Sequence, residues 1–330
     1  MPVTERSPAV TDPSTGREAS VPTESPPVSV LLPTVTWTDA CREVCEQLGP
    51  RDELLIVCDS PDDPVADSAA ARLDGARLVV AGEPVGCSGK CNAIATGMEA
   101  ATNDRIVWTD DDFHHPPDWL EQLTADYERQ GPTTEAPVFV GRDPLAYLLE
   151  PSYATSTALA AAGHMAWGGA VVFDRADVDE GALLHDLRRT VNDDGTLGEH
   201  VDFTGAGRTR PVEIGGTIRE TLERHTRFMQ ASLRHGRAAW GLLAVVSTLI
   251  GVAALLNPLV GFVATTLGYA AMYAALGIRR WTVLLAYPAT VLGPVLIAYG
   301  LARRTFVWGG RRYRWRSMFD VEVITSRGRP

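Results

Sequence analysis

The fold is decided by Ile106-Val107-Trp108-Thr109-Asp110-Asp111-Asp112-Phe113, in which a short apolar run ends in three consecutive carboxylates. The run predicts a buried strand, which Pro116 and Pro117 prevent from continuing. Acids at the carboxyl end of a buried strand stand where open α/β sheets bind their ligands. Two carboxylates spaced i and i+2 suit a hard divalent cation that also binds substrate phosphates. The simpler alternative is an acidic N-cap of a following helix.

Similar apolar runs precede this one and alternate with helical patterns. Strands are expected at Val28–Thr34, Leu54–Asp59 and Arg77–Val80, and helices around Asp39–Leu48 and 90–101. This alternation is typical of an α/β fold with parallel strands, whose ligand loops lie at the carboxyl ends of the strands. Asp59 and Asp110 then lie along one edge of the sheet, which favours a nucleotide pocket there.

A glycine-rich turn, Gly86–Ala93, opens the third helix. Free backbone N–H groups and the helix dipole favour an anion such as a phosphate at this position. The turn is not a Walker A motif, because no Ser or Thr follows Lys90. Lys90 is the only lysine of the chain, which indicates a positional requirement. The alternative is that this lysine is incidental.

Three later segments carry further candidate residues. In Gly163–Phe173, which predicts another strand, the pair Gly168 and Gly169 allows a ligand to approach the backbone, unless it marks a plain bulge. Thr190–Gly198 holds a second acidic cluster, in which one carboxylate suits a general base, with a helix N-cap as the alternative. Arg224–Phe228 suits either a pyrophosphate clamp or anchoring at a membrane surface.

Residues 238–301 are almost uncharged and contain three apolar segments, near 238–256, 258–277 and 282–301. Each is long enough to be a membrane-crossing candidate. Two crossings return Arg279 and Arg280 to the cytoplasm, as the positive-inside rule prefers. A third would export the arginines that follow residue 301. We therefore predict that 282–301 forms a re-entrant or interfacial hairpin, and that Trp308–Arg316 is an interfacial strip of arginines and aromatics.

The amino-acid composition indicates the kind of cell and compartment in which the protein works. The 330 residues carry a net charge of −11, and an acidic chain with one lysine fits the salt-adapted cytoplasm of a halophilic cell and argues against a nucleic-acid partner. Residues 1–27 are rich in Pro, Ser, Thr and Glu and lack a signal-peptide core, so a disordered tail is expected. The odd count of five cysteines, without a secretory signal, predicts reduced intracellular thiols, and the CxxxC spacing of two pairs is loose for zinc.

Taken together, these strings resemble family 2 glycosyltransferases with the GT-A fold, most closely the membrane-bound branch similar to ceramide glucosyltransferases. The resemblance covers residues 28–320. Its matched strings, in chain order, are Val30–Thr34, Asp59, Gly89–Ala93, the D-x-D of Asp110 and Asp112 with Pro116, Pro117, Trp119 and Leu120, Trp167–Ala170, Asp193–Leu197, Arg224–Phe228 and Trp308–Arg314. The chain departs from the family at Phe228, where Trp is usual, and at Asp193, where Glu is usual.

The resemblance implies an organisation and a set of roles. A GT-A, Rossmann-like nucleotide-sugar-binding domain at 28–230 would be followed by an α-helical membrane module at 231–320 and a tail at 321–330. Asp194, with Asp193 as a second candidate, would be the catalytic base. The donor would contact the residues Thr34, Asp59, Lys90, Asp110, Arg224 and Arg227. Trp167, Gly168 and Gly169 would lie on the acceptor side, and Asp110 and Asp112 would bind Mg²⁺ or Mn²⁺.

The implied activity is that of an inverting, metal-dependent hexosyltransferase. It would move a sugar from a nucleotide sugar, with a UDP-sugar as the expected donor, to a lipid acceptor. The protein would be a multi-pass membrane protein with its catalytic domain in the cytoplasm. Two alternatives remain at this point: a processive polysaccharide synthase, for which three apolar segments are few, and a non-catalytic membrane-anchored nucleotide-sugar-binding protein.

Overall fold

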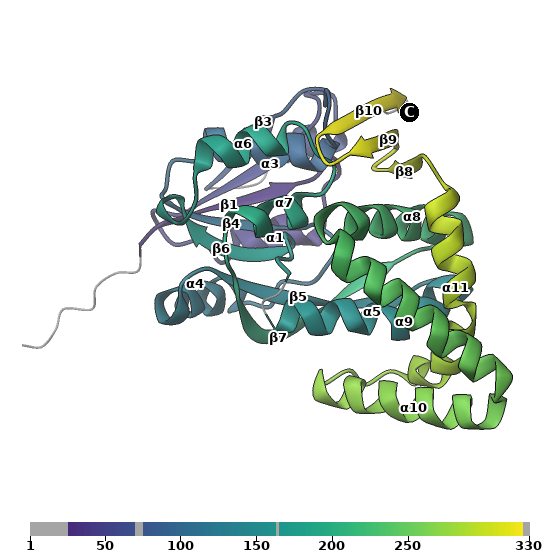
Figure 1. Cartoon of the computed structure of the whole chain (residues 1–330). Coiled ribbons are helices and arrows are strands. Elements are labelled where there is room, and N and C mark those ends of the chain that lie inside the picture. Colours follow the sequence, from purple (N-terminus) through teal and green to yellow (C-terminus); the bar gives the residue numbers. More distant parts are fainter. Residues whose placement is uncertain (1–25, 70–74, 163–164, 326–330) are drawn as a thin grey trace, which may run out of the picture.

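The computed structural model describes residues 26–69, 75–162 and 165–325, and its centre is a seven-stranded sheet (Figure 1). The strand order is β3-β2-β1-β4-β6-β5-β7. The strands are β1 (Val28–Pro33), β2 (Glu53–Cys58), β3 (Ala76–Val80), β4 (Arg105–Thr109), β5 (Thr133–Gly141), β6 (Ala170–Asp174) and β7 (Thr204–Ile214). The predicted tail lies outside the described residues, except for 26 and 27.

The first half of the sheet is parallel, as predicted. Strand β1 pairs in parallel with β2 and β4, so that Val30 lies between Leu54 and Val107. All five residues of β4 are buried, which explains why its sequence is apolar almost throughout. In the second half, for which no pairing was predicted, β6 is antiparallel to both β4 and β5, and β5 is parallel to β7. Strand β5 was not predicted, because its run contains Glu135 and Pro137.

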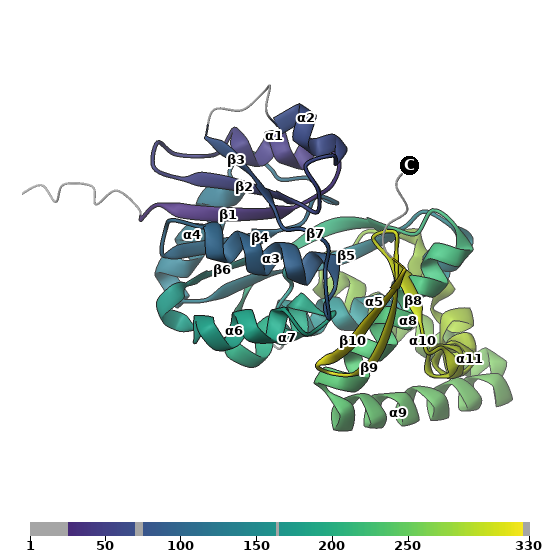
Figure 2. The same ribbon diagram turned by 90° about the horizontal axis from the view of Figure 1, so that it is seen from above.

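Helices cover both faces of this sheet (Figure 2). They are α1 (Asp39–Cys45), α2 (Pro64–Ala69), α3 (Gly89–Ala100), α4 (Trp119–Gln130), α5 (Pro144–Ala161), η1 (Arg175–Asp177), α6 (Glu180–Leu187) and α7 (Asp193–His200). Apolar side chains of α1, α4 and α5 pack in one core cluster, and those of α3, α6 and α7 pack in another. Successive residues of β1 point to opposite clusters, as the two-residue period of a strand requires.

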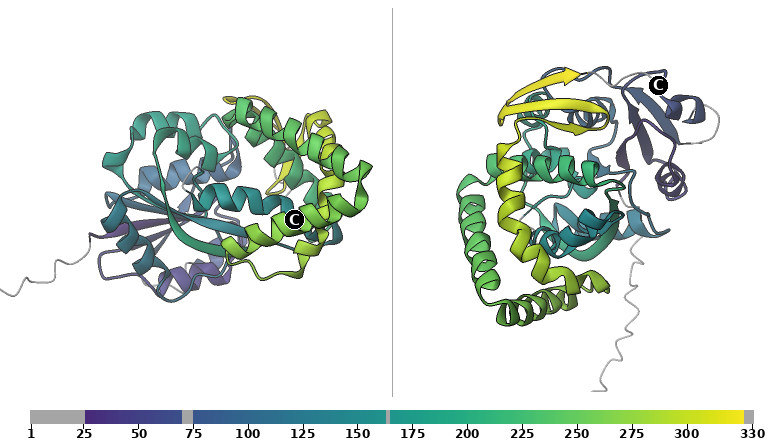
Figure 3. Two further views of the ribbon diagram at one scale, coloured as in Figure 1. Left: turned by 60° about the horizontal axis from the view of Figure 1, so that its bottom comes forward. Right: turned by 90° about the vertical axis from the view of Figure 1, so that its right-hand side faces the viewer.

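The chain continues through α8 (Ile218–His235), α9 (Arg237–Leu256), α10 (Pro258–Ala275), η2 (Trp281–Leu285) and α11 (Ala286–Ala302). Three helical segments, of 20, 18 and 22 residues, are long and apolar enough to cross a membrane. Helices α9 and α11 lie side by side, and α10 crosses their lower end in the right-hand view of Figure 3. A side chain at Gly251 would come within 2.7 Å of Thr290 O, so this glycine permits the close approach of α9 and α11.

The hairpin predicted for 282–301 is wrong. The segment is one continuous helical element, in which Pro294 lies inside α11. Proline is tolerated here because neighbouring helices compensate for the backbone groups that it leaves free. Along its length α11 packs against α5 and α8 of the preceding part of the chain. His225 Nε2 lies 3.0 Å from Leu296 O, and Gln230 Nε2 donates to Arg303 O at 3.1 Å.

After α11 the chain forms a small antiparallel sheet of β8 (Phe306–Trp308), β9 (Arg311–Ser317) and β10 (Asp320–Thr325). The predicted interfacial strip is therefore made of strands, whose residues Arg311 and Tyr313 are buried. Residues 320–325 form β10 rather than a tail, because Val321 packs in the small core and Glu322 pairs with Arg314 at 2.9 Å. The rest of the predicted tail, 326–330, lies outside the described residues.

A fully buried carboxylate, Glu135 of β5, joins this strand to its neighbour β7. It accepts from Arg208 Nε at 2.8 Å and from Arg210 Nε at 2.6 Å. The indole of Trp119, at the start of α4, donates to the same carboxylate at 3.2 Å. Burying a charge is favourable only when it is paired and hydrogen-bonded, and Glu135 meets both conditions.

We predict that Glu135→Ala lowers the free energy of unfolding by about 3–5 kcal/mol, because Arg210 loses its buried counter-charge and Arg208 keeps only its pair with Asp126. Glu213→Ala is the matched control, since Glu213 is 63% exposed and pairs with Arg142 at 3.0 Å on the surface. Exposed pairs contribute little to stability. Thermal unfolding in detergent measures both variants, and equal melting temperatures would contradict the prediction.

Candidate active site

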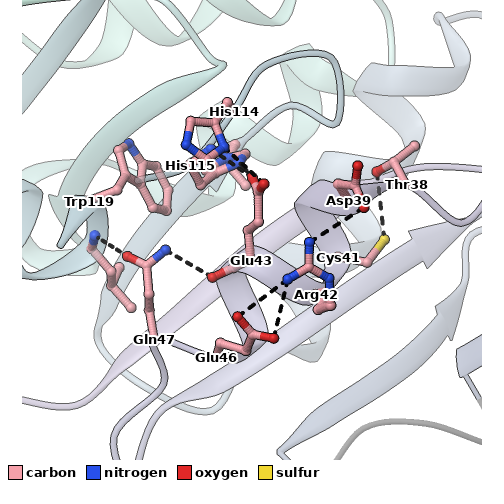
Figure 4. Close-up of polar contacts among 12 residues, drawn as sticks. Thr38, Asp39, Cys41, Arg42, Glu43, Glu46, Gln47, His114, His115 and Trp119 are labelled. Carbon is pink, nitrogen blue, oxygen red and sulfur yellow. Dashed lines mark hydrogen bonds and ion pairs between the residues drawn. The ribbon is translucent and has the colours of Figure 1, made fainter. Parts of the chain in front are cut away.

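Helix α1 contacts the acidic loop that follows β4, through polar contacts of Glu43 (Figure 4). Glu43 lies 2.8 Å from His114 Nδ1 and accepts the backbone N–H of His115 at 2.8 Å. The buried His115 ring lies 2.7 Å from Thr109 Oγ1, and burial lowers the pKa of His115 to about 3. His115 is therefore neutral and structural. The sequence did not predict this support, which fixes the loop that carries Asp110 and Asp112.

The single lysine lies at the centre of the site. Ser88 caps α3 by accepting the N–H of Cys91, which places Lys90 in the first turn of the helix. Lys90 Nζ lies 2.6 Å from Asp110 Oδ1 and 2.8 Å from Asp193 Oδ2. Burial acts to lower the pKa of Lys90, but the nearby carboxylates, Asp110 first, outweigh it and raise this pKa well above its ordinary value. The ammonium therefore stays charged and links two acidic clusters.

The second acidic cluster begins α7, and its two carboxylates differ. Asp193 is buried and paired with Lys90, whereas Asp194 Oδ1 accepts the backbone N–H of Gly168 at 2.6 Å. Burial, together with the charge of Asp193, raises the pKa of Asp194 to about 7. A side chain at Gly168 would come within 2.6 Å of Asp193 and 2.8 Å of Asp194, so only glycine fits beside the pair.

The other predicted acceptor-side residues are adjacent. A side chain at Gly169 would collide with the indole ring of Trp167. Trp167 is buried and packs on Phe113, with the ring centroids 5.2 Å apart. The two glycines therefore allow close packing just before β6. This packing brings the loop after β4 against the start of α7. Residues 163 and 164, the first of this predicted stretch, lie outside the described residues.

The D-x-D carboxylates fit a divalent cation that is shared with a substrate. Asp112 is exposed, yet the surrounding protein and the charge of Asp110 raise its pKa to about 7. No group of three or more His, Cys, Asp or Glu suited to a metal occurs within 26–69, 75–162 and 165–325. Two oxygen ligands with the remainder from phosphates and water is the usual arrangement for Mg²⁺ at phosphate sites.

The arginines of α8 face the acidic clusters. Both Arg227 and Arg224 interact electrostatically with these carboxylates, Arg224 with Asp112. The guanidinium of Arg227 lies 3.8 Å from the ring centroid of Trp308 in β8, and burial with the charge of Arg224 lowers its pKa to about 10. Phe228 packs on Phe139 and Tyr153 at centroid distances of 5.7 and 5.6 Å. Its ring also lies under the guanidinium groups of Arg224 and Arg227, at 5.7 and 5.4 Å.

The predicted nucleotide-binding acid is already paired in the structure. Asp59 Oδ2 accepts from Arg311 Nη1 at 2.7 Å, and the Gly89 N–H donates to Tyr313 Oη at 3.2 Å. The hydroxyl of Thr34 donates to Thr36 O at 2.7 Å and so is engaged within its own loop. Arg311 and Tyr313 were missed as individual site residues. The signal in the sequence was the alternation of residue types within Trp308–Arg314, which is typical of a strand. In the structure, every second side chain of β9 from Arg311 to Trp315 is buried.

The described part of the chain thus gathers most predicted residues at the carboxyl end of the parallel strands. Lys90, Asp110, Asp193 and Asp194 lie together, with Arg227 close by. Asp59 follows β2, and a side chain at Gly89, the first residue of α3, would come within 3.0 Å of Arg311 Nη1 and 3.7 Å of Asp59 Oδ1. The arrangement holds a cationic centre, a fixed carboxylate base candidate and a carboxylate pair for a metal.

Comparison with solved structures gives distant matches. A mycobacterial protein is 17% identical, covering 64% of this chain and 74% of its own, with a TM-score of 0.41. Mannosyl-3-phosphoglycerate synthase from Rubrobacter xylanophilus is 17% identical (65% and 75% covered, TM-score 0.41). Glucosyl-3-phosphoglycerate synthase from Mycobacterium tuberculosis, solved with phosphoglyceric acid, is 21% identical (58% and 70% covered, TM-score 0.33). No curated protein matches this chain.

The family comparison is more extensive. The model of the family described as Glycosyl transferase family 21 matches residues 9–321, which is nearly the whole chain. The mixed sheet of the structure, mostly parallel and covered by helices on both faces, is GT-A-like. The chain therefore belongs to glycosyl transferase family 21, the family of the ceramide glucosyltransferases, and is a glycosyltransferase.

Proposed function

We propose that this protein transfers a sugar from a nucleotide sugar, with a UDP-sugar as donor, to a membrane lipid and inverts the anomeric centre. The observation that carries the proposal is Asp194, a carboxylate whose pKa is raised to about 7 and whose oxygen is fixed by the Gly168 N–H at 2.6 Å. A general base is most effective when its pKa lies near the working pH. Asp193 is less suited to this role because it pairs with Lys90.

The donor would be held by the cationic residues and the acids at the strand ends. Lys90 and Arg227 supply positive charge beside the D-x-D, where the diphosphate would lie. Asp110 and Asp112 would hold Mg²⁺ or Mn²⁺, which neutralises charge on the departing diphosphate. Asp59 would bind the nucleotide base, and its pairing with Arg311 extends the pocket to β9.

In the chemical step, Asp194 takes the proton from the acceptor hydroxyl. The oxygen forms a bond to the anomeric carbon as the bond from that carbon to the diphosphate oxygen breaks. The nucleoside diphosphate leaves with the bonding electrons, so no general acid is needed. Lys90 and Arg227 stabilise the negative charge that develops there, which preorganised cations do without reorganising during the reaction.

A lipid acceptor is supported by the helices beside the site. Helix α11 is held at both ends: Arg280, before η2, donates to Glu150 of α5 at 2.7 Å, and Arg303 pairs with Glu223 of α8 at 3.4 Å. Helix α11 is held to the catalytic part along its length, and α9 packs side by side with α11, so the two helices share one orientation. We therefore propose that α9 and α11 lie together at the cytoplasmic interface, with the exposed apolar side chains of α9 and α10 in the membrane.

Asp194→Asn should reduce kcat by about 10²–10⁴-fold, because only deprotonation of the acceptor is lost. Donor affinity, measured by calorimetry with a UDP-sugar, should stay unchanged. Asp193→Asn is the matched control. It breaks an ion pair of Lys90, so it should weaken donor binding more than it slows turnover. The base is assigned to the wrong residue if Asp193→Asn loses turnover while Asp194→Asn keeps it.

Activity should require a divalent cation, because Asp110 and Asp112 leave the diphosphate charge only partly neutralised without one. Excess chelator should abolish transfer, and Mg²⁺ or Mn²⁺ should restore it. Asp112→Ala should weaken Mn²⁺ binding and Mn²⁺-dependent donor binding together. Asp118→Ala, at an exposed acid of the same loop, is the control and should change neither. Full activity in chelator would mean that the acidic residues Asp110–Asp112 do not bind a metal and serve only as a helix cap.

Single cysteines test the membrane arrangement. With native cysteines protected, a membrane-impermeant reagent applied to intact cells should label neither Asn257→Cys, between α9 and α10, nor Ser317→Cys, at the end of β9. The reason is that both positions then stay on the cytoplasmic side of the membrane. Labelling of Asn257→Cys would mean that α9 crosses the membrane, and labelling of Ser317→Cys would mean that α11 crosses it.

A further inference from the structure

A second cavity, of about 610 Å³, lies between α8, the end of α11 and β9. Five arginines line it, namely Arg234, Arg303, Arg304, Arg314 and Arg316, and no acidic side chain does. In an acidic chain with a net charge of −11, this is a local concentration of positive charge. Cavities that focus one sign of charge attract ligands of the opposite sign.

The carboxylates around the cavity compensate only part of this charge. Arg303 pairs with Glu223 at 3.4 Å, and Arg314 pairs with Glu322 at 2.9 Å. Arg316 shares Glu322 and also pairs with Asp320 at 3.3 Å. In the described ranges no carboxylate pairs with Arg234 or with the exposed Arg304. The cavity is therefore positively charged even after all its ion pairs are counted.

Arg234 has polar and aromatic partners but no carboxylate partner among the described residues. Its guanidinium stacks on the Trp315 ring at 4.5 Å and donates to Gln230 O at 3.0 Å and to Trp315 O. Its Nε is buried and has no partner among the described residues. Burial lowers the pKa of Arg234 to about 10, and no neighbouring negative charge opposes this effect. Buried charge of this kind is usually compensated by a bound counter-charge.

One wall of the cavity is apolar. Met229 and Leu233 of α8 and Leu301 of α11 line it. Leu301 is 51% exposed and lies at the end of the apolar helix α11, which packs on α9 with its many exposed apolar side chains. A ligand that fits both walls carries an anionic group beside a hydrocarbon body, as an anionic lipid does.

The cavity is separate from the active site. On α8, Met229 and Leu233 lie about half a turn around the helix from Arg224 and Arg227, whereas Arg234 lies on the side of Arg227, two turns further along. None of the catalytic or donor-binding residues proposed above lines the cavity. A ligand of this cavity therefore contacts residues other than those proposed to bind the donor.

We propose that the cavity binds the phosphate headgroup of an anionic membrane lipid that is not the acceptor. The arginines hold the phosphate, and the apolar wall of α8 and α11 contacts the start of the acyl or isoprenoid chain. Because α8 also carries Arg224 and Arg227, a lipid bound here fixes the catalytic residues of this helix relative to the membrane surface. The proposal does not depend on the identity of the donor or acceptor.

The test uses the full chain in a neutral detergent and measures binding of short-chain phosphatidylglycerol by thermophoresis. Phosphatidylcholine of equal chain length is the neutral-lipid arm, and inorganic phosphate is the free-anion arm. Phosphatidylglycerol should bind the wild-type protein in preference to both. The double variant Arg304→Gln, Arg314→Gln should bind it about tenfold or more weakly, since each basic residue contributes about 1 kcal/mol.

Two further variants make the result specific. Arg219→Gln removes an exposed arginine of α8 outside the cavity and should keep wild-type affinity. Leu233→Trp fills the cavity without removing charge and should weaken binding. Wild-type affinity in the double variant and in Leu233→Trp would overturn the proposal. Equal weakening by Arg219→Gln would mean general attraction, and inorganic phosphate binding as tightly as the lipid would mean a free-phosphate site.

Discussion

The site depends on one ammonium group placed between two acidic clusters. Lys90 Nζ bonds Asp110 at the end of β4 and Asp193 at the start of α7, so three segments separated in sequence meet at one charge. Without it, Asp110, Asp193 and Asp194 would repel one another in a buried environment. An arginine has a planar, larger head and does not fill the same space. This explains why a chain that otherwise uses arginine keeps a lysine here.

Ion pairs also hold the apolar helices against the catalytic part. Glu150 binds Arg280 at 2.7 Å and Glu223 binds Arg303 at 3.4 Å, on either side of α11. Both acids are buried, so each pair is partly shielded from solvent screening. The apolar helix α11 is thus positioned by charge pairs at its two ends, while apolar packing fills the space between them. Helix α8 takes part in both regions, because it carries Arg227 beside the acidic clusters and Glu223 against Arg303.

Sequence patterns predicted the parts of this structure that follow from local chemistry. The apolar runs located β1 to β4, and the acids at their ends gathered where a parallel sheet places ligands. They did not reveal β5, because Glu135 is buried only by virtue of Arg208 and Arg210 on β7. Tertiary partners also decided β8 to β10, where Arg311 is buried against Asp59. When the partner of a charged residue lies far away in the sequence, a local sequence pattern does not predict where that residue is placed.

The pairing of Arg311 with Asp59 joins residues 252 positions apart, and the three apolar helices lie between them in the chain. During synthesis the strands and the lysine emerge first, but the rim of the nucleotide pocket emerges only after α11. The surroundings of Asp59 are therefore completed only after the three apolar helices have left the ribosome. A chain that ends after α11 lacks the β8–β10 sheet and, with it, the arginine that pairs with Asp59.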